Sequence, residues 1–258
     1  MLLLEKLGPT RTGRPATRAQ AERVHDASYL DALEARAEMG WLDGDTLAGP
    51  TSWEGALLAA GCAIEAAVEG GFALVRPPGH HALPDRAMGF CLVGNVAVAA
   101  RHAQDELGVE RIAIVDWDVH HGNGTEAMFR GDDSVLVVSL HQWPFYPGTG
   151  GPGTSDATTL NVPLPAGSGD AEYAAAFTEL VEPAVRGFDP QLVLVSAGFD
   201  AHVDDPLAHM EVTEQGFEEL ARRSAQLGPR VGAVLEGGYN LRTLPRLVEG
   251  ALRGFEAA

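Results

Sequence analysis

Short apolar runs alternate along the chain with longer segments that have helical periodicity. The runs are rich in β-branched residues, which is typical of strands buried on both faces of a sheet. We predict strands at residues 72–75, 111–115, 134–140, 192–195 and 231–235. We predict helices at residues 19–39, 52–68, 95–107, 170–186, 213–228 and from 243 onward. This alternation favours an α/β fold with three layers, α/β/α, in which helices cover both faces of a mainly parallel central sheet.

Turn-forming and capping residues separate these elements. Ser52, Asp170 and Thr213 stand at predicted helix starts and are expected to be N-caps. Residues 142–169 contain many prolines and glycines, and we predict a long loop that forms a wall of a binding site. No internal repeat and no linker interrupts the pattern, so we predict a single domain over residues 1–258.

Polar side chains follow the predicted strands. The run Ile112–Val115 passes at once into Asp116-Trp117-Asp118-Val119-His120-His121. Parallel strands bring their carboxyl ends to one edge of the sheet, where open α/β sheets hold their ligands. We therefore expect one rim to collect six residues that are far apart in the sequence: His80, His81, Asp118, His120, Asp200 and Tyr239.

Three of these residues predict a metal site. Asp118, His120 and Asp200 offer two carboxylates and one imidazole, which suits zinc or iron. Three protein ligands leave a coordination position open, as a catalytic metal requires. The alternative is that the aspartates merely cap the helices that follow. The position of Asp200 at the end of a buried strand favours the metal.

The paired histidines predict acid–base chemistry. His80 and His81 follow Pro77-Pro78-Gly79, whose restricted backbone would hold both imidazoles in place. A histidine beside a metal-activated water acts as general base and then as general acid. Asp116 and Asn123 are candidates to orient the imidazoles through a ring nitrogen. The hydroxyl of Tyr239, which follows two glycines, would donate to a developing oxyanion. A lone histidine or tyrosine would more often be a packing residue.

Composition narrows the partners and the compartment. The net charge of −18 argues against a nucleic-acid partner, because phosphates would be repelled. It is compatible with cationic substrates, or it serves only solubility. The two cysteines, Cys62 and Cys91, indicate a reducing compartment, and we expect a cytoplasmic protein. No apolar run approaches the length of a membrane span, so no membrane contact is predicted.

Together these motifs resemble the histone deacetylase family, which has the arginase–deacetylase fold. The matches follow the family's order along nearly the whole chain: Arg76-Pro77-Pro78-Gly79-His80-His81-Ala82, Gly89-Phe90-Cys91, Asp116 to Gly124, Ser139-Leu140-His141, Pro147-Gly148-Thr149-Gly150, Ser196-Ala197-Gly198-Phe199-Asp200 and Glu236-Gly237-Gly238-Tyr239. The resemblance implies a zinc-dependent amidohydrolase that removes acetyl or related acyl groups from lysine side chains of proteins or peptides.

The resemblance also assigns catalytic roles. Asp118, His120 and Asp200 match the zinc ligands of the family. His81 matches the general base and acid, and His80 matches its electrostatic partner. The oligomeric state is not predicted by any of these motifs.

Further positions match the substrate site of the family. Tyr239 matches the residue that hydrogen-bonds the substrate carbonyl. Phe90, with Gly89 before it, and Tyr146 match the walls of the acyl-lysine tunnel. Leu207 is similar to a neutral gatekeeper of the class II enzymes.

Two other positions are informative. Asp45 falls near a family aspartate that holds the substrate backbone, and Asn123 stands where class I enzymes carry aspartate, so the chain looks class II-like. The resemblance also implies a structural monovalent cation, potassium or sodium, held by Asp116, Ser139 and the carbonyls of Asp118, His120 and Leu140.

The start of the sequence departs from the family pattern. The family usually begins with a strand and a His-Pro-Glu-Arg-Pro-like segment, whereas this chain starts about where the first helix would. We expect the first strand to be missing or replaced and the mouth of the site to be altered. Three alternatives stay open: an acetylpolyamine or other small acylated-amine deacetylase, an arginase-like ureohydrolase, and an inactive acyl-lysine-binding module.

Overall fold

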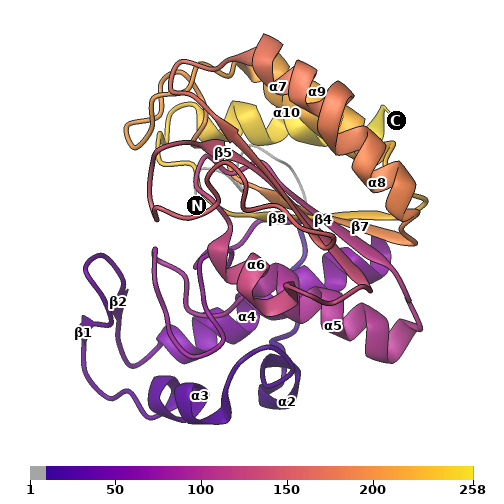
Figure 1. The fold of residues 1–258 in the computed structure, drawn as a ribbon. Coiled ribbons are helices and arrows are strands. Elements are labelled where there is room, and N and C mark those ends of the chain that lie inside the picture. The colour runs from indigo at the N-terminus through magenta and orange to yellow at the C-terminus, as the bar shows by residue number, and fades with distance from the viewer. Residues whose placement is uncertain (1–9, 258) are drawn as a thin grey trace.

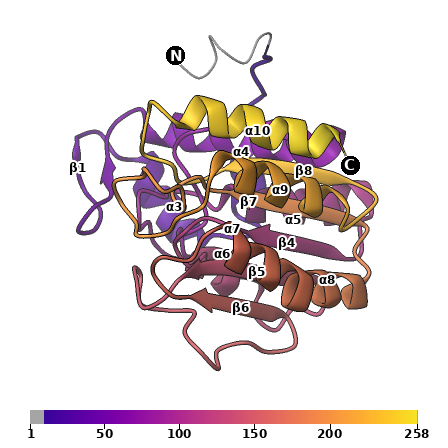
Figure 2. The ribbon, with the colours of Figure 1, turned by 90° about the horizontal axis from the view of Figure 1, so that it is seen from above.

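The computed structural model describes residues 10–257. A six-stranded sheet runs through the centre, and every neighbouring pair of its strands is parallel. The strands lie in the order β3 (Gly71–Ala73), β8 (Val231–Leu235), β7 (Leu192–Ala197), β4 (Ile112–Asp116), β5 (Val135–Gln142) and β6 (Thr159–Leu164). Figure 2 shows the strands from β8 to β6 side by side beneath the helices of one layer.

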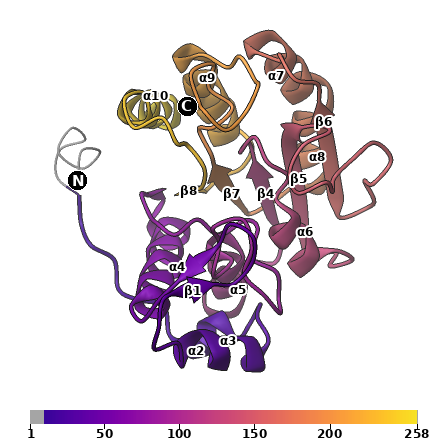
Figure 3. The same ribbon diagram turned by 90° about the vertical axis from the view of Figure 1, so that its left-hand side faces the viewer.

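Helices cover both faces of this sheet, which confirms the predicted three-layer α/β/α fold (Figure 1). One layer contains α2 (Arg18–Ala21), α3 (Ala27–Glu34), α4 (Ser52–Glu69) and α5 (Asn95–Leu107), with α6 (Asn123–Phe129) beside them. The other contains α7 (Asp170–Ala176), the π-helical η1 (Phe177–Val181), α8 (Glu182–Phe188), α9 (Glu214–Ala225) and α10 (Leu244–Glu256). Figure 3 shows the two layers on opposite sides of the strands.

The central strand β4 divides the apolar core in two. Ile112 and Ile114 belong to the cluster beneath α4 and α5, whereas Ala113 and Val115 belong to the cluster beneath α9 and α10. All four are fully buried. Successive side chains of a strand point to opposite faces, so an all-apolar run is the sequence of a strand that has a core on each side.

The sheet has one strand more than the five predicted. β6 lies inside residues 142–169, which the prolines and glycines had marked as loop. Pro163 has no N–H to donate, but β6 is at the edge of the sheet and pairs only with β5. Proline is tolerated on edge strands for this reason.

The predicted helix over residues 19–39 is wrong. α2 ends at Ala21 and α3 spans Ala27–Glu34, and the chain then enters a small antiparallel hairpin, β1 (Gly40–Trp41) and β2 (Leu47–Ala48). The capping box between Thr17 and Gln20 starts α2. Hydrogen bonds between His25, in the segment after α2, and the distant residues Leu83 and Gly94 outweigh the helical periodicity of this segment.

The predicted caps have mixed outcomes. Thr213 caps α9, since its side chain accepts a hydrogen bond from the Gly216 N–H. Ser52 is the first residue of α4 and not its N-cap, and Asp170 lies inside α7. The Asp170 carboxylate instead accepts bonds from the main-chain N–H (2.8 Å) and the hydroxyl (2.6 Å) of Thr213, which ties α7 to α9.

His25 attaches the N-terminal helices to the loop that precedes α5. Its Nδ1 lies 3.0 Å from the Leu83 carbonyl, and its Nε2 accepts a bond of 2.9 Å from the Gly94 N–H. Tyr29 adds a bond of 2.6 Å from its hydroxyl to the Leu92 carbonyl. These contacts fix both ends of the loop that carries Gly89 and Phe90. No helix within residues 10–257 is long and apolar enough to cross a membrane.

Acid should weaken the fold partly through His25. Burial lowers the pKa of His25 to about 4, so the folded chain takes up this proton later than the unfolded chain, and stability falls as the pH drops below about 6.5. Between pH 7 and pH 5 the wild type should lose about 2 kcal/mol more unfolding free energy than His25→Gln, which cannot titrate. Denaturant melts at each pH measure the difference.

The matched control is His102→Gln, because His102 is much less buried and should contribute a smaller slope. Equal pH slopes for the wild type and His25→Gln would contradict the assignment.

Candidate active site

The carboxyl ends of three strands bring polar residues into register. Asp116 at the end of β4 pairs with Ser139 of β5 on one side and with Ser196 of β7 on the other. The chain leaves β4 toward Asp118 and leaves β7 toward Asp200. Parallel strands therefore deliver these side chains to one edge, as the polar residues after each apolar run predicted.

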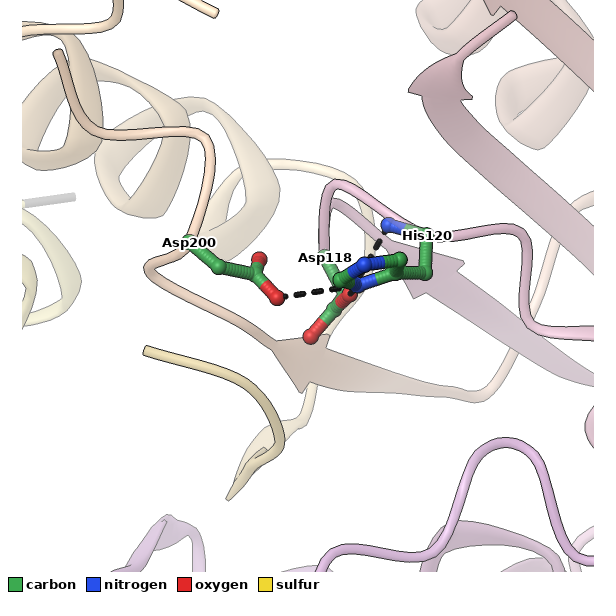
Figure 4. A group of neighbouring side chains, drawn as sticks. All are labelled: Asp118, His120 and Asp200. Carbon is green, nitrogen blue, oxygen red and sulfur yellow. Dashed lines mark hydrogen bonds and ion pairs between the residues drawn. The ribbon is translucent and has the colours of Figure 1, made fainter. Parts of the chain in front are cut away.

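Asp118, His120 and Asp200 converge on one point, and Figure 4 shows both carboxylates directed toward the imidazole. His120 Nδ1 lies 3.0 Å from Oδ1 of Asp118 and 3.1 Å from Oδ2 of Asp200. The three ligand atoms lie within 4.8 Å of one another, and all three residues are buried. Within the described residues this is the one group of histidines, cysteines and carboxylates with such geometry.

Main-chain groups hold the two carboxylates. Gly237 N–H donates to Asp118 Oδ2 at 2.6 Å, and Val119 N–H donates to Asp200 Oδ1 at 2.9 Å. A Cβ atom on Gly237 would stand 2.1 Å from Asp200 Oδ2, so only glycine lets the main chain approach this closely. The loop after β8 thus lies against both carboxylates of the group.

The charges of this group suit a cation. Burial opposes ionisation of Asp118, but His80 and His120 hold its pKa well below the ordinary value. Burial and the charge of Asp118 raise the pKa of Asp200 to about 6. Two adjacent buried carboxylates destabilise each other unless a positive charge lies between them. Two oxygen ligands and one nitrogen ligand match the ligand set of a catalytic zinc ion.

The two histidines after the Pro-Pro-Gly turn have different partners. His80 Nδ1 lies 2.9 Å from Asp116 Oδ2, and His81 Nδ1 lies 2.7 Å from Asn123 Oδ1. Burial opposes protonation of His80, but Asp118 and Asp116 outweigh it and raise the pKa well above its usual range. Burial, and then repulsion from His80, lower the pKa of His81 well below its usual range.

Tyr239 lies in the loop that follows β8. Its ring is 5.8 Å from that of Phe90 in an edge-to-face arrangement. Its main-chain N–H donates to Asp205 Oδ2 at 2.7 Å. Its phenol hydroxyl makes no hydrogen bond with any residue in the range 10–257, and burial raises its pKa, so the group remains a free donor.

Gly89 and Phe90 form a tight turn against His81. Both have positive φ angles, +57° for Gly89 and +67° for Phe90. A Cβ atom on Gly89 would come within 2.4 Å of the His81 ring, so glycine is required there by contact as well as by conformation. Phe90 is in the left-handed region without being glycine, a strain that the surrounding contacts must hold. One such contact is the bond of 3.0 Å from the Phe90 N–H to the Thr46 hydroxyl.

The remaining substrate candidates lie toward the surface. Phe90 is 40% exposed, Tyr146 37% and Leu207 42%, whereas His80 and His81 are buried. The Tyr146 ring packs edge-on against His81 with 5.2 Å between centroids. Asp45 is close enough that, after burial, its charge is the largest cause raising the pKa of Tyr146.

The potassium candidates are neighbours, although their role stays a prediction. Asp116 and Ser139 are partners in the β4–β5 register, with Leu140 next along β5. Asp116 Oδ1 accepts a bond of 3.0 Å from the Asp118 N–H. The Ser139 hydroxyl lies 3.0 Å from His141 Nδ1.

Three acidic residues that support the site had no predicted role. Glu236 accepts hydrogen bonds from the Gly79 and His80 N–H groups. Asp205 binds the main chain of both Tyr239 and Leu207. Glu126 lies 2.9 Å from His121 Nε2, and His121 Nδ1 in turn lies 2.7 Å from the hydroxyl of Thr149, in the loop after Tyr146. The signal for Glu236 was available, because it follows an apolar strand as Asp116 does.

The chain matches the histone deacetylase domain over residues 2–255. Histone deacetylase 10, chloroplastic, of Oryza sativa subsp. japonica is 44% identical, over 94% of this chain and 61% of that protein. The histone deacetylase-like amidohydrolase of Pseudomonas aeruginosa is 42% identical, over 91% of this chain and 67% of that protein. Polyamine deacetylase HDAC10 of Homo sapiens is 40% identical, over 92% of this chain and 40% of that protein.

The comparison with a solved structure agrees with the sequence comparisons. The crystal structure of the HDA15 HD domain matches with a TM-score of 0.91 at 39% identity, covering 96% of this chain and 74% of that chain. In the sequence comparison, the chain spans about three fifths of the length of the rice relative. The parallel sheet and its helical layers are those of the arginase–deacetylase fold. With the domain matched almost from end to end and the fold shared, the chain belongs to the histone deacetylase family.

Proposed function

We propose that the protein is a zinc-dependent deacylase that removes acetyl or related acyl groups from lysine side chains of proteins or peptides. The observation that carries this proposal is the position of His81 next to the three metal-ligand candidates. Its Nδ1 faces an amide oxygen of Asn123, which only accepts hydrogen bonds. The ring proton is therefore on Nδ1, and Nε2 is left with the lone pair that a general base needs.

Asp118, His120 and Asp200 would hold the zinc ion. When bound, zinc would polarise the acyl carbonyl and lower the pKa of a coordinated water. His81 takes a proton from the attacking water through Nε2 and returns it to the leaving lysine amine. Asp116 keeps His80 oriented through Nδ1 at 2.9 Å, and the His80 ring, 4.0 Å from that of His81, faces the second imidazole.

Tyr239 donates its hydroxyl to the oxygen that gains charge as water adds to the carbonyl. The loop bond to Asp205 fixes its main chain, and the Phe90 ring fixes its side chain. Phe90 and Tyr146 flank the approach with aromatic faces, which suits the aliphatic stem of an acylated lysine. Leu207 is neutral and exposed, and Asp205 accepts hydrogen bonds from its main-chain N–H and from that of Tyr239.

The same proposal includes a structural potassium or sodium ion and a cytoplasmic location. Asp116, Ser139 and the carbonyls named above supply hard oxygen ligands of the kind such ions prefer. The two cysteines are both free thiols, the usual state in a reducing compartment.

A second candidate is an acetylpolyamine deacetylase. It is favoured by Asp43 and Asp45, two neighbouring carboxylates near Tyr146 that would attract a second amine. It is also favoured by the likeness to a human polyamine deacetylase. The neutral Leu207 favours the peptide substrate. The alternative of an arginase-like ureohydrolase, whose chemistry needs two metal ions, loses support. Residues 10–257 contain one group of three possible metal ligands and no second such group.

Comparing kcat/KM for an acetyl-lysine peptide and for N-acetylspermidine, with the zinc-loaded protein, decides between the two substrates. We expect the peptide to be turned over faster. Turnover of the polyamine alone would reverse this order, and no turnover of any acylated amine would remove the proposal.

Two substitutions test the assigned roles. Tyr239→Phe removes the oxyanion donor and should lower kcat about 10²–10³-fold, and His81→Ala removes the base and should lower it about 10²–10⁴-fold. Neither residue is a metal-ligand candidate, so the zinc content measured by mass spectrometry should stay at the wild-type level. Full activity of both variants would exclude this mechanism.

Gly237→Ala tests the metal group through the main chain. The new Cβ would stand 2.1 Å from Asp200 Oδ2 and 2.5 Å from Asp118 Oδ2, so the carboxylates must move and the zinc affinity should fall about 10–100-fold. Competition with a fluorescent chelator measures the affinity. Gly187→Ala is the matched control, since a Cβ there meets no atom within 4 Å. An unchanged affinity for Gly237→Ala would mean that zinc binds elsewhere.

A further inference from the structure

We propose that Arg76 and Glu236 form a reciprocal clamp that positions His81 relative to Tyr239. Arg76 stands near the start of the loop that carries the two histidines, and Glu236 begins the loop that carries the tyrosine. Each side chain binds the main chain of the other loop. This inference rests on the proposed function, because it explains how the base and the oxyanion donor are kept in register.

The clamp lies beyond the last residue pair that joins β3 to β8. β3 and β8 pair from Gly71–Gly232 to Ala73–Val234, and no ladder pair follows. Both functional loops begin beyond that point, so main-chain pairing does not fix one against the other. A misplacement of about 1 Å between catalytic groups is enough to lower a rate about 10²-fold. Some other contact must therefore set the distance between the loops.

Glu236 supplies half of that contact. Its carboxylate is fully buried. Oε2 accepts bonds from the Gly79 N–H at 2.7 Å and the His80 N–H at 3.2 Å, and Oε1 accepts one from the Ser196 hydroxyl at 3.3 Å. Hydrogen bonds from two consecutive N–H groups to one carboxylate oxygen fix the direction of the peptide planes, and with them the start of both histidine side chains.

The histidine turn is also confined from its other side. A Cβ atom on Gly79 would stand 2.4 Å from the Asn95 nitrogen and 2.7 Å from the Val93 carbonyl oxygen. The turn thus lies between the start of α5 and the Glu236 carboxylate. Loss of the carboxylate would leave two buried N–H groups without a partner, which favours movement of the turn.

Arg76 supplies the other half. Its guanidinium donates to the main-chain carbonyls of Glu236 and Gly238, the second at 3.4 Å. These carbonyls bracket Gly237, whose N–H holds Asp118, and the next residue is Tyr239. The planar fork of arginine can reach both carbonyls at once from two nitrogens, whereas all the N–H donors of a lysine ammonium are on one nitrogen. The clamp therefore sets the path of the loop from Glu236 to Tyr239.

Glu236 acts through other residues. None of its hydrogen bonds goes to Asp118, His120 or Asp200, and it binds the histidine loop only through main-chain N–H groups. A buried carboxylate costs free energy unless hydrogen bonds compensate, so a packing role alone would be served better by an apolar side chain. Glu236 and Arg76 are positioning residues in this sense.

The test uses substitutions that separate hydrogen bonding from packing. Glu236→Ala should lower kcat about 10–100-fold with KM within about twofold and zinc content unchanged. Glu236→Gln keeps an oxygen acceptor for both N–H groups and should stay within about threefold of the wild type. Arg76→Lys should lower kcat about tenfold, and combining it with Glu236→Ala should add little, since both disrupt one device.

The matched control is Asp170→Ala. Asp170 also accepts from a main-chain N–H of another element, but it links α7 to α9 and should alter thermal stability without altering kcat. An unchanged kcat for Glu236→Ala, an equal loss for Glu236→Gln, or an equal loss for Asp170→Ala would overturn the clamp.

A second measurement separates the clamp from the proposed function. The amide protons of Gly79 and His80 bond to a carboxylate and should resonate downfield in ¹H–¹⁵N spectra of the wild type. Glu236→Ala should move both upfield, and Glu236→Gln should move them less. If the wild type hydrolyses no acylated amine, the proposed function fails while these shifts still test the clamp. Unmoved Gly79 and His80 amides in Glu236→Ala would overturn the clamp whatever the activity.

Discussion

Buried negative charge at the carboxyl ends of β4, β7 and β8 is the constraint on which the rest of the site depends. Asp116, Asp118, Asp200 and Glu236 are all buried at this edge. Isolated carboxylates in such surroundings would take up protons or disrupt the fold. Two imidazoles, main-chain N–H groups and a position for a cation compensate this buried negative charge. The proposed catalytic groups and the groups that support them are thus parts of one charge balance.

Much of the fold and the inner site could be predicted, because both depend on short-range patterns. Apolar runs such as Ile112–Val115 identify strands, and the polar residues after them identify the rim. β6 was missed because Pro163 is informative only once the strand is known to be an edge. The break after α2 was missed because His25 bonds to Leu83 and Gly94, which lie far along the chain. The roles of Asp205 and Glu236 are equally non-local.

The site has an inner half and an outer half, and different contacts hold each of them in place. The inner half rests on strand ends and on hydrogen bonds to the main chain. The loop after Tyr146 is held instead by a polar chain through Thr149, His121 and Glu126, which also accepts a bond of 2.8 Å from Asn161 of β6. The edge strand β6, which the prolines concealed, therefore supports the loop after Tyr146, a proposed wall of the substrate approach.

The left-handed conformation of Phe90 bears on how this family member could diverge. A β-branched residue would be strongly disfavoured there, and the residues most tolerant of that backbone, glycine and asparagine, carry no aromatic ring. Substitution at position 90 is therefore restricted to a few side chains without a β-branch. Tyr146 and Leu207 have no such backbone restriction. Among the proposed substrate-contacting residues, these two positions therefore accept a wider range of side chains than Phe90 does.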